Sequence, residues 1–284
     1  MASPTALPPV PPPVKTTSPP PIEITTLARI CRIGDLDDDD VNRSFHDDLE
    51  SFERKGHRLL ELWPVLFSAV RYARPQIIKL LFSRGLAMNQ MYIKQAIQTR
   101  SKDVFQAFIE SGWDVNKPWV NFHPPVLACF VDDIDFTQWF LDRGADPDAQ
   151  CFLDITPLSF AVRSAEIPVI NLLLDRGSIH KGQLVHHAVE RSENVIEVLQ
   201  ILIARGASIN QVQYSEHLQS WGHEHFKGLG TPLHRAVELG RGDVVEFLLK
   251  MGADRDVKDT KGRTPLDVAR EVGDEELVRL LEPV

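Results

Sequence analysis

Cysteine is scarce in this sequence. Its 284 residues include three cysteines, Cys31, Cys129 and Cys151, which are too few and too widely spaced for a disulfide framework or a zinc finger. We therefore expect a protein of a reducing compartment, in the cytoplasm or the nucleus.

Long apolar runs and basic stretches are missing as well. No run approaches the ~18 residues of a membrane-spanning helix, and the first residues lack the apolar core of a signal peptide. The formal net charge is -9, which does not favour nucleic acid as a partner. These absences predict a soluble protein that binds neither membranes nor nucleic acids.

The motifs of common enzymes are also absent. The sequence has no phosphate-binding GxxxxGK[ST] loop and no GxSxG nucleophile motif. His223 and His225 flank Glu224, but no further ligand follows at a spacing that suits zinc, which needs three or four. We expect no catalytic residues, no metal and no cofactor.

What the sequence does contain is repetition. Thr-Pro-Leu begins at Thr231 and again at Thr264, 33 residues later. Threonine caps a helix, and proline suits its first turn. Two helices and a loop follow, and a glycine that can adopt a left-handed conformation ends the second helix at Gly252. Further copies of this helix end lie at Gly85, Gly112, Gly144, Gly177 and Gly206.

The period of 33 and the phrase Thr-Pro-Leu-His-Arg-Ala at 231–236 resemble the ankyrin-repeat family. The resemblance implies an all-α solenoid of paired antiparallel helices with finger loops. We expect about seven repeats, plus a possible degenerate repeat at the N-terminus. The predicted divisions are a disordered proline-rich tail at 1–22, the degenerate repeat with an acidic loop at 23–60, and the ankyrin-repeat domain at 61–284.

Departures from the period mark candidate binding loops. The connections after Gly85 and Gly177 are short, whereas residues 211–229 form an insertion. This insertion carries Tyr214, Trp221 and Phe226. It packs back onto the stack or protrudes as a recognition loop, and an unusual enzyme with a site at the insertion is a further alternative. The predicted fingers expose Trp119, Phe122 and Phe152, either for local packing or for binding.

A second candidate set follows from the resemblance. In ankyrin repeats, the positions after the alanine of the first helix face a concave groove. The matching residues here are Arg71, Tyr72, Arg163 and Arg191. Arginine pairs well with carboxylates and phosphates, so a line of these residues would orient acidic groups of a partner; ordinary solvated surface is the alternative.

Function follows only coarsely from these features. The resemblance implies a monomeric, non-catalytic module that binds another protein in its groove and fingers, as an adaptor, an assembly chaperone or an inhibitor. Nine acidic residues between Asp35 and Glu53 suggest, alternatively, a chaperone of a basic client. The proline-rich tail contains PxxP, which is typical of ligands of SH3 and WW domains. No feature identifies the partner.

Overall fold

The computed structural model describes residues 20–120 and 122–282. These residues form two compact units, which divide between Ser111 and Gly112. The described part of the chain is all-α, and its one extended pairing is an isolated bridge between Val120 and His123. Residues 1–19, most of the predicted proline-rich tail, lie outside the described residues.

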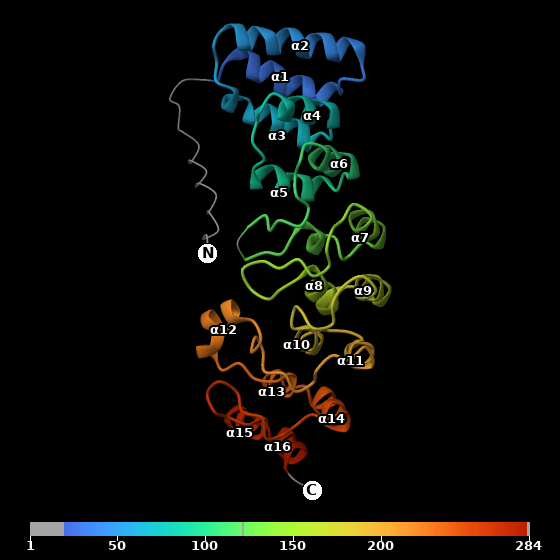
Figure 1. Cartoon of the computed structure of the whole chain (residues 1–284), viewed down its shortest axis with the longest axis vertical. Coiled ribbons are helices and arrows are strands. Elements are labelled where there is room, and N and C mark those ends of the chain that lie inside the picture. Colours follow the sequence, from blue (N-terminus) through green and yellow to red (C-terminus); the bar gives the residue numbers. More distant parts are fainter. Residues whose placement is uncertain (1–19, 121, 283–284) are drawn as a thin grey trace. The chain divides into compact units, whose positions relative to one another are not determined.

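The first unit contains three helix pairs and a short 3-10 helix (Figure 1). Each pair buries its apolar face against its neighbours, and Phe45, Phe52, Phe105 and Phe108 are among the fully buried side chains. The elements are α1 (Ile22–Ile33), α2 (Asp39–Arg54), η1 (Leu59–Leu62), α3 (Trp63–Arg71), α4 (Pro75–Ser83), α5 (Gln90–Thr99) and α6 (Lys102–Glu110).

The acidic segment of the first unit is mostly helical, whereas a loop was expected there. Asp38 caps α2, because its side chain accepts hydrogen bonds from the backbone N–H groups of Asp40 and Val41. Asp39 and Asp40 then occupy the first turn, where carboxylates interact favourably with the helix dipole. Acidic residues at this point therefore start a helix instead of enlarging a turn.

The second unit continues the same pattern of paired helices. Its first pair begins with a 3-10 helix, and an additional helical segment lies between the third and fourth pairs (Figure 1). The elements are η2 (Val126–Cys129), α7 (Ile134–Leu141), α8 (Pro157–Ser164), α9 (Ile167–Leu174), α10 (Leu184–Val189), α11 (Val195–Ala204), α12 (Leu218–Glu224), η3 (His225–Lys227), α13 (Pro232–Glu238), α14 (Gly242–Lys250), α15 (Pro265–Val272) and α16 (Glu275–Leu281).

The expected number of repeats is confirmed. From α3 to α16 the described residues form seven pairs, with η2 in place of one first helix, and α1 with α2 form an additional pair before them. Such pairs stabilise one another by stacking, because neither helix can bury its apolar face alone. None of the helices in residues 20–120 and 122–282 is long and apolar enough to cross a membrane.

The Thr-Pro-Leu phrases act as helix caps. Thr156, Thr231 and Thr264 each form a capping box with the residue three positions later. His234 takes part in one of these boxes: its Nδ1 accepts from the Thr231 N–H at 3.1 Å, and its Nε2 donates to the Arg263 carbonyl oxygen at 3.0 Å. Each phrase thus fixes the start of a helix, and the histidine also ties its helix to the next loop.

Five of the six helix-end glycines have the expected left-handed backbone, with φ between 84° and 99°. Gly177 differs. A Cβ at Gly177 would lie 2.9 Å from the Asp148 Oδ1 atom. Close packing against the preceding finger therefore favours glycine there.

Candidate functional site

The most distinctive surface feature of the second unit is a cluster of three aromatic rings, which we call the ring triad. Phe122 and Phe152 come from two neighbouring fingers, and His223 comes from α12. The ring centroids of Phe122 and Phe152 are 5.4 Å apart, and His223 lies 6.2 Å from Phe122 and 5.6 Å from Phe152. Phe122 is 54% exposed and Phe152 is 40% exposed. Residues more than 100 positions apart thus form one exposed aromatic surface.

The rings of the triad lie at steep angles to one another. The interplanar angles are 65° for the two phenylalanines, and 74° and 83° for His223 with Phe122 and Phe152. Edge-to-face contacts of this kind stabilise aromatic pairs by about 0.5–1.5 kcal/mol. The rings therefore form a corner, not a flat surface.

The backbone beside the triad is held by a buried carboxylate. Asp154 accepts hydrogen bonds from the Gly182 N–H at 2.9 Å and from the side-chain amides of Gln150 and Gln183, at 2.6 Å and 2.5 Å. Its own N–H donates to the Ser220 hydroxyl at 2.8 Å. Asp154 and Ser220 are buried. Asp154 therefore joins the finger of Phe152 both to the loop at 182–183 and to α12.

The insertion at 211–229 is folded and packs on the stack. The Tyr214 N–H donates to Gln183, and the Leu229 N–H donates to Thr260 at 2.8 Å. Two apolar side chains remain outside, since Leu218 is 88% exposed and Phe226 is 65% exposed. Packing onto the stack, one of the two alternatives, is thus observed, and part of the insertion still faces solvent.

The predicted aromatic anchors differ in their environment. Tyr214 is buried, at 6% exposure. This corrects its prediction as a partner-binding residue, because a buried ring offers no surface to a partner. Trp221 is half-buried and stacks on His225 at 6.3 Å. Trp119 is half-buried and stacks on His123 at 5.5 Å, and its Nε1 has no hydrogen-bond partner among the described residues.

The predicted arginine line is only partly a surface feature. Arg71 is exposed beside Tyr72, with 5.8 Å from the guanidinium carbon to the ring centre. Arg163 is exposed as well. Arg191, however, is 5% exposed and donates to the carbonyl oxygens of Val162 at 2.6 Å and Ala165 at 2.9 Å. Its prediction as a partner-binding residue was wrong, because backbone carbonyls already occupy its guanidinium group.

The contacts of Arg191 belong to a recurring arrangement. Arg74 donates to the carbonyl oxygens of Cys31 and Arg32, and Arg241 donates to those of Val189 and Arg191. In each case an arginine of one helix pair reaches the end of the first helix in the preceding pair. The last carbonyls of a helix lack partners within it and carry partial negative charge, so arginine suits them. These arginines stabilise the stack.

Buried histidines make the stability of the second unit depend on pH. Burial lowers the pKa of His186 to about 4, and its hydrogen bond to the Gly230 carbonyl offsets this only in part. In the unfolded chain its pKa returns to about 6.5. The unfolded state then binds more protons, so stability falls as the pH drops from about 6.5 towards 4.

We expect urea unfolding of the second unit to show a loss on the order of 2 kcal/mol between pH 7 and pH 4.5 from His186. His186→Gln keeps a hydrogen-bond donor but cannot titrate, so its stability will change less across the same range. Equal changes in both proteins would contradict the assignment to His186.

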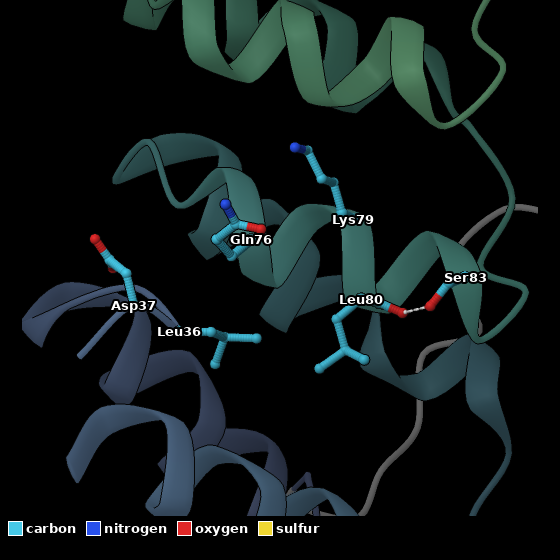
Figure 2. Close-up of a pocket in the computed structure, with 6 residues that line it drawn as sticks. All are labelled: Leu36, Asp37, Gln76, Lys79, Leu80 and Ser83. Carbon is cyan, nitrogen blue, oxygen red and sulfur yellow. Dashed lines mark hydrogen bonds between the residues drawn. The ribbon is translucent and has the colours of Figure 1, made fainter. Parts of the chain in front are cut away.

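A second candidate site is a pocket in the first unit. It has a volume of about 530 Å³ and lies between the turn that precedes α2 and helix α4. Figure 2 shows Leu36 and Leu80 among its lining residues, with Lys79 and Asp37 at its edges. Lys79 Nζ already pairs with Glu110 at 2.6 Å. Because its lysine is already paired, this pocket is a weaker candidate than the ring triad.

Within residues 20–120 and 122–282, no group of three or more His, Cys, Asp and Glu side chains could hold a metal ion. Burial raises the pKa of the Cys129 thiol to about 11, which disfavours the reactive thiolate. Sequence reasoning considered His223 only as a metal ligand and missed its place beside Phe122 and Phe152, because no sequence pattern brings these segments together.

Comparisons with known proteins agree with the repeat architecture. A family model described as ankyrin repeats in three copies matches residues 215–282. The chain is 28% identical to the ankyrin repeat protein nuc-2 of Neurospora crassa over 57% of its own length and 14% of the relative. It is 26% identical to human palmitoyltransferase ZDHHC13 over 61% of its length and 32% of the relative.

A third relative, the human 2-5A-dependent ribonuclease, is 32% identical over 34% of this chain and 11% of that protein. The chain thus matches at most about a third of the length of any of these three relatives. A palmitoyltransferase and a ribonuclease have different activities, so the similarity assigns neither activity to this chain.

Proposed function

Because this chain is an ankyrin-repeat protein, we propose that it acts as a non-catalytic module that binds a protein partner through the ring triad. Ankyrin repeats are a protein-interaction module. The observation that supports this surface is the exposure of two phenylalanine rings on neighbouring fingers, 5.4 Å apart. Exposed aromatic rings are common anchors in protein interfaces.

The mechanism rests on preorganisation. The finger of Phe152 and helix α12, which carry two of the three rings, are held before binding by the hydrogen bonds of Asp154 and Ser220, so little conformational entropy is lost there when a partner arrives. Arg163 offers a guanidinium group to an acidic side chain, whereas Arg191 contributes only to the fold.

The test is affinity capture with the intact chain and with Phe122→Ser/Phe152→Ser. Loss of two anchors is expected to weaken partner binding at least tenfold, which corresponds to about 1.4 kcal/mol. Leu60→Ser in η1 is the matched control, because Leu60 is 66% exposed but lies in the first unit. Unaltered capture by the double variant, with an unchanged melting temperature, would refute the proposal.

A second candidate function is that of a chaperone for a basic client protein. It is supported by exposed carboxylates on α2, including Asp39, Asp40 and Asp47. The same capture experiment distinguishes the two functions when Asp39→Lys/Asp40→Lys is added, which leaves the cap residue Asp38 in place. Partners lost only with this variant would support the client-binding function.

A further inference from the structure

We propose that the ring triad binds the proline-rich N-terminal segment of this same chain, residues 1–19. This inference rests on the proposed function, since it assigns an occupant to the same surface. In the intact protein the segment then competes with external partners for the triad.

The apolar chemistry of the two parts is complementary. Proline-rich segments are recognised by surfaces lined with aromatic rings, and their restricted backbone loses little entropy on binding. Residues 1–19 contain seven prolines, and five of them lie between Pro8 and Pro13. The triad presents two exposed phenylalanine rings and an imidazole at steep angles, so a pyrrolidine ring can contact two ring faces at once.

Further apolar surface extends from the same insertion that supplies His223. Leu218 begins α12 and is 88% exposed, and Phe226 in η3 is 65% exposed. A single proline would fill only the corner between the rings. A run such as Pro8–Pro13 would measure about 19 Å as a polyproline helix, at about 3.1 Å per residue, which exceeds the largest separation between rings of the triad, 6.2 Å.

The charges are complementary as well. The three segments that carry the triad, residues 113–125, 145–156 and 211–229, contain six acidic residues and two lysines. Residues 1–19 contain a single charged side chain, Lys15, and no acidic residue. Attraction therefore favours this segment. The exposed acidic helix α2 of a second copy would instead be repelled from the triad.

The direct test uses a labelled peptide of residues 1–20 and the chain that lacks residues 1–19, which keeps Pro21 before α1. We expect saturable binding with a Kd in the micromolar range by fluorescence anisotropy. Phe122→Ser/Phe152→Ser will weaken it at least tenfold, and Leu60→Ser will not. A peptide with alanine at Pro8, Pro9, Pro11, Pro12 and Pro13 will lose binding, and one with Lys15→Glu will bind a few-fold more weakly.

The second part of the test uses the intact chain. Because its own segment already occupies the triad, it will bind the labelled peptide at least threefold more weakly than the shortened chain does. Sedimentation shows whether that segment acts within one chain, which leaves a monomer, or between two copies, which gives a dimer; either result supports the assignment. Absence of saturable binding, or equal binding by the double variant, overturns it.

The two proposals fail in different ways. If the double variant loses captured partners while the peptide does not bind, the N-terminal segment is not the occupant and the proposed function stands. If the peptide binds the triad but captured partners are unaffected by the double variant, the proposed function fails. The assignment of residues 1–19 to the triad then stands.

Discussion

Arg191→Ala is expected to destabilise the second unit by about 4 kcal/mol. Its guanidinium group donates to the carbonyl oxygens of Ala161, Val162, Ala165 and Glu193, at 3.3, 2.6, 2.9 and 3.0 Å. Alanine would leave these carbonyls without a charged donor. Hydrogen bonds to charged groups contribute about 1.5–3 kcal/mol each, and they do not add fully because the four share one side chain.

Urea unfolding followed by tryptophan fluorescence measures this loss. Arg163→Ala is the matched control, because Arg163 is also an arginine near the end of a first helix but has an exposed side chain. Its effect will remain within about 0.5 kcal/mol. Similar values for the two variants would show that the carbonyl contacts of Arg191 do not stabilise the repeat.

Asp154→Ala is the second change with a large expected effect, about 3 kcal/mol. The carboxylate accepts from one backbone N–H and two side-chain amides, all of which lose their acceptor. Unpaired buried donors cost about 1–3 kcal/mol each. The backbone N–H of residue 154 still reaches the Ser220 hydroxyl, so we expect the insertion to loosen without unfolding the stack.

Two measurements check the change at Asp154. Urea unfolding gives the lost stability, and limited trypsin digestion reports the insertion through cleavage after Lys227, which will become faster. Asp175→Ala is the control, because that carboxylate forms an exposed ion pair with Arg205 at 2.9 Å, worth at most about 1 kcal/mol. Unchanged digestion of Asp154→Ala would show that this carboxylate does not hold the insertion.

Much of the fold was predictable because its signals are local. Thr231, Pro232 and His234 encode a cap within four residues, and the capping box is present. Gly252 ends its helix with the expected left-handed backbone. The period then places each copy, since every repeat contacts mainly its neighbours.

The site was less predictable, because its contacts join distant segments. Phe122 and Phe152 were both predicted in finger loops, but neither the sequence period nor the loop lengths indicate that α12 brings His223 beside them. The structure of the insertion, which no repeat template describes, decides this.

The prediction that Arg191 binds a partner failed for a different reason. It matches Ser164 in the repeat pattern, three residues after the alanine of the first helix, but α10 ends at Val189, whereas α8 extends through Ser164. Arg191 therefore lies beyond its helix and points back towards the preceding pair. The sequence carried one sign of this, because the distance from Ala188 to Gly206 is 18 residues where the other copies have 16.

The contacts of Arg74, Arg191 and Arg241 all run from a later segment of the chain to an earlier helix, so their order of formation follows the order of synthesis. Each of these arginines completes a helix that was synthesised about 30 to 50 residues earlier. During translation, a newly made pair thus keeps a frayed helix end until the following turn leaves the ribosome. A chain that stops just before such an arginine would contain every residue of its last helix pair. That pair would still lack the arginine that binds the carbonyl oxygens at the end of its first helix.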